Sequence, residues 1–156
     1  MNEYLWIAIL SLTPISELRG AIPTGFALGL NNTKVILISI LFNILVIPIV
    51  YLFLEFIHKH LIKIEIYAKY FNKFLISKRK ILDKYKSSNT EFISLMLFVG
   101  IPLPFTGAYT GTLLAWFFNM NIKKMILSIT CGIIISALII SLLTYGGIVG
   151  FKTFII

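Results

Sequence analysis

Charged residues are scarce in this 156-residue chain, at 13% of the sequence, whereas soluble globular domains carry roughly 25%. Acidic residues are the scarcest, with six Asp and Glu against 14 Lys and Arg, so the net charge is +8. Hydrophobic residues make up 58% of the chain. This composition excludes an ordinary soluble domain and predicts an integral membrane protein. Because the basic residues flank apolar runs, we expect anionic lipid headgroups, and not nucleic acid, as their partner.

Cysteine and catalytic motifs are equally sparse. Cys131 is the single cysteine, which excludes an intramolecular disulfide, and its apolar surroundings are typical of a small core residue. The sequence contains no recognisable nucleotide-binding, nucleophile or metal-binding motif. We therefore expect neither an enzyme nor an ATP-driven pump, and we expect no cofactor and no metal ion.

Long apolar runs without strict alternation indicate helices, so the predicted fold is all-α. There are four such blocks, at residues 5–30, 35–57, 92–118 and 125–151. The second and fourth are long enough to cross a bilayer, which needs about 20 residues. The first and third contain clusters rich in proline, glycine and threonine, at residues 14–29 and 100–111. Because proline removes a backbone donor and clashes with the preceding turn, we expect each of these blocks to break into a re-entrant helical hairpin.

The same order of features occurs twice: a broken block, a polar turn, and an apolar helix. We therefore predict two repeats in one membrane domain, residues 4–57 and 92–151, offset by 87 to 89 residues. The linker, residues 58–91, carries nine of the Lys and Arg residues, and apolar positions between residues 64 and 75 predict an amphipathic helix on the membrane surface.

Topology follows from these basic residues. The positive-inside rule places the linker in the cytoplasm of a multi-pass inner-membrane protein. Lys123 and Lys124 fall on the same side only if each hairpin returns to the side from which it entered. The two repeats are then inverted, which is a recurrent plan of secondary transporters.

Glu17 and Arg19 are ionisable residues within the first apolar block. Charges at bilayer depth cost at least about 2.5 kcal/mol each, so they commonly mark a transport or proton path. Because residues two apart do not face each other on a helix, either the chain is non-helical here or each charge has its own partner. Glu17 is a candidate proton carrier and Arg19 a candidate anion or charge-balancing contact. The alternative is a structural pair that pins the hairpin.

The second broken block offers hydroxyl groups and no charge. These hydroxyls could contact a substrate, or they could only satisfy the broken backbone. Asn43 in the first long helix could pack there or line the same cavity. The spacing of Gly25 with Gly29 and of Gly107 with Gly111 allows close helix packing, within the chain or in a dimer. The candidate substrate and proton path comprises Glu17, Arg19, Gly20, Pro23, Thr24, Pro102, Pro104, Thr106, Gly107, Tyr109 and Thr110.

Two motifs carry a family resemblance: Glu-Leu-Arg-Gly-Ala-Ile-Pro at residues 17–23 and Pro-Leu-Pro-Phe-Thr-Gly-Ala-Tyr-Thr-Gly at residues 102–111. With them the chain resembles the small multi-drug export protein family over essentially its whole length. The resemblance implies a distant similarity to the DedA/VTT membrane proteins, in which two oppositely oriented re-entrant hairpins meet inside the membrane and proton-coupled transport or lipid translocation is proposed. This chain has Thr106 where DedA proteins typically carry an arginine-bearing motif.

Together, these features predict a small secondary exporter, proton-coupled, that moves an amphipathic small molecule. One alternative is a translocase or scramblase for a phosphate-bearing lipid carrier. Another is a membrane scaffold or assembly factor that transports nothing. Four apolar blocks give a thin wall around a cavity, which is compatible with a homodimer. The sequence leaves open the substrate, the transport direction, the coupling ion, the oligomeric state and whether Glu17 and Arg19 are functional or structural.

Overall fold

The computed structural model describes residues 2–61, 63, 88–104 and 106–155, and every element in these ranges is a helix. The all-α prediction is confirmed for this part of the chain. The helices are α1 (Glu3–Leu12), α2 (Glu17–Ala27), α3 (Asn32–Leu61), α5 (Ser88–Gly100), α6 (Ala108–Phe117) and α7 (Ile122–Ile155). The amphipathic helix predicted within the linker falls on residues 64–75, which lie outside the described residues.

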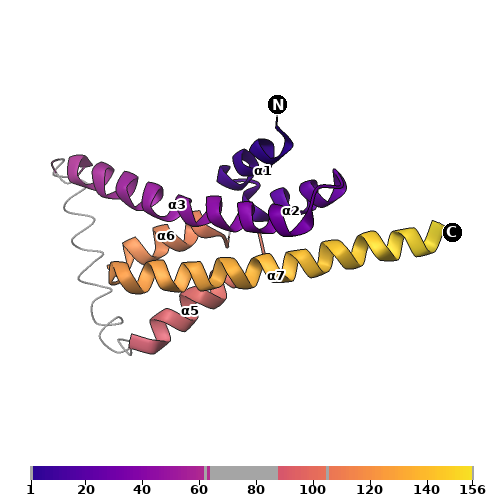
Figure 1. Ribbon diagram of the computed structural model, residues 1–156. Coiled ribbons are helices and arrows are strands. Elements are labelled where there is room, and N and C mark those ends of the chain that lie inside the picture. The colour runs from indigo at the N-terminus through magenta and orange to yellow at the C-terminus, as the bar shows by residue number, and fades with distance from the viewer. Residues whose placement is uncertain (1, 62, 64–87, 105, 156) are drawn as a thin grey trace.

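The two long helices, α3 and α7, are long and apolar enough to cross a membrane, as the blocks at residues 35–57 and 125–151 predict. At 1.5 Å per residue the 30 residues of α3 extend about 45 Å, which exceeds the hydrocarbon thickness of about 30 Å. Figure 1 shows α3 and α7 side by side and running in opposite directions. They form the framework on which the short helices pack.

The short helices form two helical hairpins, α1 with α2 (the first hairpin) and α5 with α6 (the second hairpin). The break within each hairpin occurs where the sequence has prolines. The chain leaves helical structure at residues 13–16, around Pro14, and at residues 101–104 and 106–107, near Pro102 and Pro104. In the first block the break is shorter than the predicted cluster of residues 14–29, because Pro23 lies inside α2. A proline there removes only one hydrogen bond of the helix, which apolar helices tolerate.

The short helices α2 and α6, each of which precedes a long helix, end in the same way. The residue after the C-cap has a left-handed backbone in each, with a φ of 69° at Gly29 and 53° at Asn119. The next amide N–H donates to the carbonyl oxygen five residues earlier, over 3.1 Å after α2 and 2.9 Å after α6. This is the Schellman arrangement, which satisfies carbonyl groups at a helix end.

The turns into the long helices also match. The side-chain oxygen of Asn31 accepts the Lys34 N–H over 3.1 Å at the start of α3, and that of Asn121 accepts the Lys123 N–H over 3.0 Å at the start of α7. The two asparagines are 90 positions apart, as are Gly29 and Asn119. An asparagine at this position satisfies an amide that the first helical turn leaves unpaired.

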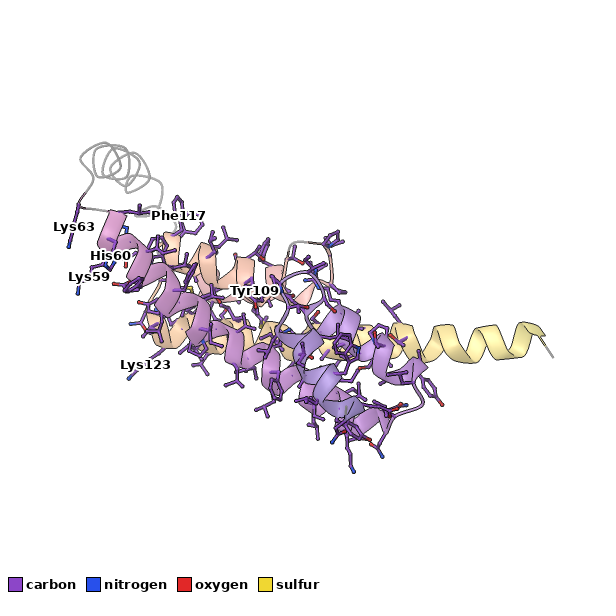
Figure 2. The ribbon with its side chains drawn as sticks, turned by 90° about the horizontal axis from the view of Figure 1, so that it is seen from above. Lys59, His60, Lys63, Tyr109, Phe117 and Lys123 are labelled. Carbon is purple, nitrogen blue, oxygen red and sulfur yellow. The ribbon has the colours of Figure 1, made fainter. Side chains whose placement is uncertain are left out.

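The short pairs occupy opposite ends of the long helices (Figure 1). The pair α1 and α2 lies along the first half of α3, whereas α5 and α6 lie along the first half of α7, and both breaks face the middle of the molecule. Figure 2 shows Lys59, Lys63 and Lys123 gathered at one end, with Tyr109 near the middle. The end of α3 and the start of α7 therefore share one basic end of the molecule.

A thin core joins the helices and leaves much apolar surface outside. Buried core residues include Ile7, Ile22, Val35, Ile47, Val99, Ile129 and Ile133. Large apolar side chains stay exposed along both long helices, among them Leu37, Leu52, Phe56, Leu138 and Leu142. Soluble monomers rarely expose apolar surface on this scale, whereas lipid-facing helices do.

Glycines allow the closest helix contacts. A Cβ atom on Gly25 would lie 2.5 Å from a methyl carbon of Val35, and one on Gly111 would lie 2.6 Å from a methyl carbon of Val99. These contacts lie within the chain. Gly29 takes no part in close packing within the chain, because nothing lies within 4 Å of a Cβ there. Its left-handed backbone at the end of α2 explains the glycine instead.

Candidate functional site

The two breaks in the chain meet in the middle of the molecule and enclose a pocket of about 460 Å³. The first turns of α2 and α6 contribute to its wall. Its lining consists of Pro14, Ile15, Glu17, Arg19, Pro102, Pro104, Gly107, Tyr109 and Thr110. All of these except Pro14 and Ile15 belong to the predicted path. The structure therefore brings together parts of the two clusters, residues 14–19 and 102–110, which are more than 80 positions apart in the sequence.

Glu17 binds the start of α6. Its side chain is 6% exposed, and its carboxylate faces the backbone N–H groups of Ala108 and Tyr109. A helix N-terminus carries unpaired N–H groups and a partial positive charge, so it favours a carboxylate. The carboxylate also lies directly over Gly107, where any Cβ atom would overlap it. The glycine is what allows the carboxylate to approach the helix so closely.

The backbone of Glu17 is itself unusual. Its φ of 48° is left-handed, a conformation that costs an L-residue about 1–2 kcal/mol. Within the described residues only Asn119 shares it among non-glycine residues, and Asn119 caps a helix end. Glu17 instead begins a helix, with its N–H bonded to the Thr13 carbonyl over 3.0 Å. The strained turn directs the carboxylate toward the second hairpin.

Arg19 binds the broken backbone of the second hairpin. One terminal guanidinium nitrogen donates to the carbonyl oxygen of Leu103 and the other donates to the Thr106 hydroxyl over 3.0 Å. The planar guanidinium can serve two acceptors at once in this way. Each charge thus has its own partner in the other hairpin, which is one of the two arrangements predicted for Glu17 and Arg19.

The hydroxyl groups of the second hairpin bind backbone. Tyr109 reaches the first hairpin, where its hydroxyl donates to the carbonyl oxygen of Leu12. The Thr106 hydroxyl lies 2.7 Å from the Ile101 carbonyl oxygen, and the Thr110 hydroxyl donates to the Gly107 carbonyl over 3.2 Å. These contacts agree with the alternative in which the hydroxyls satisfy a broken backbone.

Three predicted residues lie along α2 and do not line the pocket. A Cβ atom on Gly20 would collide with the Ser16 side chain, so this glycine permits the tight start of the helix. The Thr24 hydroxyl donates to the Gly20 carbonyl over 2.7 Å, and Pro23 lies inside the same helix. The structure assigns these residues to the shape of α2.

Two polar residues of the long helices line a small void that Glu17 also lines. Asn43 of α3 is fully buried and Ser136 of α7 is 2% exposed, and both line this void together with Glu17 and Arg19. The Asn43 amide nitrogen donates to the Ser11 carbonyl over 3.2 Å. The Asn43 side-chain oxygen and the Ser136 hydroxyl have no partner in the described part of the chain.

The sequence signal for this pair is weak, because an amide or a hydroxyl in an apolar span is also common at helix contacts. Asn43 lines this small void and is not among the residues that line the central pocket. Ser136 was not among the predicted path residues. Among the described residues no three His, Cys, Asp or Glu side chains lie close enough to hold a metal ion.

No curated protein and no solved structure matches the chain. The family described as "Putative small multi-drug export protein" matches residues 17–139, a range that begins at Glu17 and contains most of the residues that line the central pocket. With its long apolar helices and exposed apolar surface the chain is a membrane protein. Because the match covers more than half of the sequence, the chain belongs to the putative small multi-drug export protein family.

Proposed function

We propose that this protein is a small secondary exporter that exchanges an amphipathic small molecule for protons across the cell membrane. The observation that carries the proposal is the buried Glu17 carboxylate, which joins the two hairpins at the central pocket. A buried carboxylate inside a membrane protein is a typical proton carrier. The name of the family supports export in general terms.

The proposal includes an inverted repeat, with α1 to α3 as one unit and α5 to α7 as the other. Three features support it: α3 and α7 run in opposite directions, the two short pairs lie at opposite ends, and α2 and α6 end in the same caps. The caps differ by 90 positions, close to the offset predicted from the sequence. In this scheme each short pair is a re-entrant hairpin, and the basic end of the molecule faces the cytoplasm.

Protonation of Glu17 would loosen the contact between the hairpins. An ionised carboxylate is attracted to the backbone N–H groups of Ala108 and Tyr109, which carry the partial positive charge at the start of α6. A proton on the carboxyl group removes this charge and also removes its attraction to the start of α6. The tips of the hairpins can then separate and change the side from which the pocket is reached.

The protonated carboxyl group has an acceptor nearby. Asn43 offers a side-chain oxygen without a partner at the void that Glu17 lines, and a protonated Glu17 has one O–H to donate. A buried acceptor without a partner is costly, so this bond stabilises the protonated state. The proton thus shifts Glu17 from α6 toward α3. The contacts of Arg19 with Leu103 and Thr106 also join the two hairpins, so they must break when the tips separate.

Arg19 favours a small-molecule cargo over a phosphate-bearing lipid. Both of its terminal nitrogens already donate to acceptors of the second hairpin. A phosphate would have to displace these contacts before it could use the guanidinium fork. The same contacts would also hold together a scaffold that transports nothing, so the two functions must be separated by a transport measurement.

Proton flux in liposomes separates these functions. Wild type and Glu17→Gln are reconstituted with a pH-sensitive dye inside and challenged first with cationic amphiphiles and then with phosphorylated lipids. Glutamine keeps the shape of the side chain but cannot carry a proton. Glu55→Gln is the matched control, because Glu55 is a carboxylate at the far end of α3, where it accepts the Trp116 indole N–H over 3.1 Å.

We expect cation-driven proton flux in wild type and in Glu55→Gln, and none in a folded Glu17→Gln. A proton flux driven only by phosphorylated lipids would show that the cargo is a lipid and not an amphipathic small molecule. Silence from all three proteins, with Glu17→Gln less stable than the others, would support the scaffold. The folded fraction is measured by size-exclusion chromatography in detergent.

A further inference from the structure

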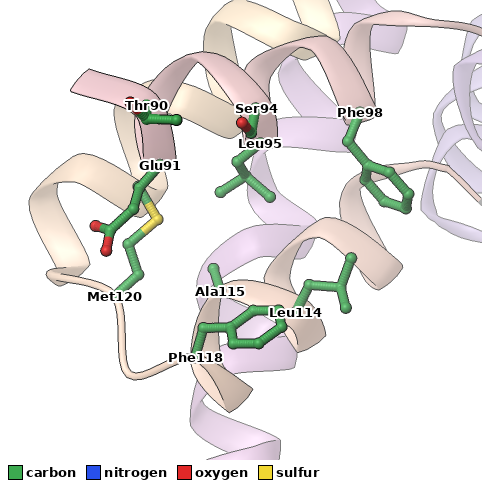
Figure 3. A pocket seen from close by; sticks show the side chains of 9 residues that line it. All are labelled: Thr90, Glu91, Ser94, Leu95, Phe98, Leu114, Ala115, Phe118 and Met120. Carbon is green, nitrogen blue, oxygen red and sulfur yellow. The ribbon is translucent and has the colours of Figure 1, made fainter. Parts of the chain in front are cut away.

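A second pocket, which shares no lining residue with the central pocket, lies between α5, α6 and the turn into α7. Its volume is about 390 Å³, within the range of roughly 300–1,000 Å³ that is typical of small-molecule sites. Figure 3 shows Glu91 and Met120 at one end of it and Phe98 and Leu114 toward the other. None of the residues predicted from the sequence as a path lies in this pocket.

The two ends of the pocket differ in chemistry. Thr90, Glu91 and Ser94 supply polar groups near the start of α5, which lies toward the basic end of the molecule. Phe98 and Leu114 line the part nearer the middle of the molecule. An amphipathic molecule fits this arrangement with its polar group outward and its apolar part inward.

Glu91 supplies the charge. Its side chain is half-buried, and within the described residues it has no hydrogen-bond or ion-pair partner. Acidic residues are rare here, and the chain as a whole is strongly cationic. A carboxylate without a partner beside an apolar cavity attracts a cation and repels an anion. Acidic residues are favoured in the first turn of a helix, and Glu91 lies in the first turn of α5. This preference does not explain why the carboxylate borders a cavity.

Aromatic side chains strengthen the preference for a positive charge. Phe98 and Phe118 both line the pocket, and the face of an aromatic ring attracts a cation. The remaining wall is apolar, with Leu95 and Ala115 buried at its base. Apolar walls bind a hydrophobic body by excluding water, whatever its charge. Charge selection therefore depends on Glu91, whereas affinity depends mainly on the walls.

We infer that this pocket binds a lipophilic organic cation, with the positive centre near Glu91 and the apolar groups against Phe98 and its neighbours. The inference rests on the proposed export function and names the class of its cargo. Such a cation partitions into the membrane and enters the pocket from there. Phe98 precedes Pro102 by about one helical turn, so the pocket adjoins the hairpin tip that Glu17 controls.

The test compares two probes of nearly equal shape and opposite charge, tetraphenylphosphonium and tetraphenylborate. Equilibrium dialysis measures the binding of each to the full chain in nanodiscs, and binding to empty nanodiscs is subtracted. The measured quantity is the Kd of a variant divided by that of wild type, so differences in membrane partition cancel. Glu91→Gln is the test variant. Glu3→Gln is the matched control, because Glu3 occupies the first turn of α1 as Glu91 does that of α5.

Glu91→Gln is expected to raise the Kd of tetraphenylphosphonium at least about fivefold, the size of a partly exposed charge pair, and not to raise that of tetraphenylborate. Glu3→Gln should change neither value. Phe98→Ala should weaken both probes, because it removes an apolar wall. Equal ratios for the two probes in Glu91→Gln, or an unchanged Kd for the cation, would overturn the inference.

Binding is measured without transport, so this inference and the proposed function can fail separately. If Glu91→Gln binds the cation as wild type does while Glu17→Gln still abolishes flux, the pocket assignment is wrong and the export function stands. If Glu91→Gln loses the cation but wild type shows no flux, the site stands and transport does not.

Discussion

A methyl group on Gly107 should break the contact between the two hairpins. The Glu17 carboxylate occupies the space that the Cβ atom of Gly107→Ala would need, so it must leave the start of α6. Gly107 has an extended backbone, with φ −98° and ψ −163°, which alanine adopts without strain. The effect of the substitution therefore comes from the displaced carboxylate and from the changed cap.

The magnitude follows from the position of the Glu17 carboxylate at the start of α6. A partly buried charge at a helix terminus contributes up to about 2 kcal/mol, so displacing the carboxylate costs about 2 kcal/mol. Alanine in place of glycine at a helix N-cap costs about 1 kcal/mol. Gly107→Ala should thus lower the free energy of unfolding by about 3 kcal/mol in wild type. In a Glu17→Ala background, where no carboxylate is displaced, the loss should be about 1 kcal/mol.

The assay is a double-mutant cycle of reversible unfolding in mixed micelles, followed by the far-ultraviolet circular dichroism of the helices. The coupling free energy between positions 17 and 107 should be about 2 kcal/mol. Gly147→Ala is the control, because nothing lies within 4 Å of a Cβ there and alanine should stabilise α7 by up to about 1 kcal/mol. A coupling free energy near zero would refute the contact between Glu17 and the start of α6.

Two further predictions use the same unfolding assay. Arg19→Lys should lower the free energy of unfolding by about 1–2 kcal/mol, because an ammonium cannot serve both Leu103 and Thr106 as the guanidinium does. The loss should shrink in a Thr106→Val background, and an equal loss in both backgrounds would contradict the assignment. Gly25→Ala should cost about 1–3 kcal/mol through overlap with Val35. Val35→Ala should relieve that cost, and no relief would show that the two helices do not meet there.

The sequence predicts the framework well because its signals are local. Uninterrupted apolar runs predict α3 and α7, and the pair Pro102 and Pro104 predicts the second break. The extent of the first break was not predictable in this way, since Pro23 lies in a helix that packing against α1 and α3 supports. Packing between distant segments decides whether one lost hydrogen bond ends a helix.

The candidate site was predictable where its residues are unusual for an apolar segment of the sequence. Glu17 and Arg19 are conspicuous in an apolar block, and their spacing predicts either a non-helical chain or a separate partner for each charge. Ser136 resembles many small residues of apolar helices, so only the three-dimensional structure brings it beside Glu17. The Glu91 pocket was not predicted either. The sequence groups Glu91 with the linker, whereas α5 begins at Ser88.

The central claim is that Glu17 couples the cargo to protons, and accumulation of tetraphenylphosphonium in liposomes tests it most directly. An imposed pH gradient supplies the driving force, while potassium and valinomycin hold the membrane potential at zero. Exchange of labelled for unlabelled cation at equal pH is measured in the same liposomes. The account predicts that Glu17→Gln keeps the exchange and loses the accumulation, because the hairpins still move but no proton is carried. Accumulation by Glu17→Gln at the wild-type level would contradict it.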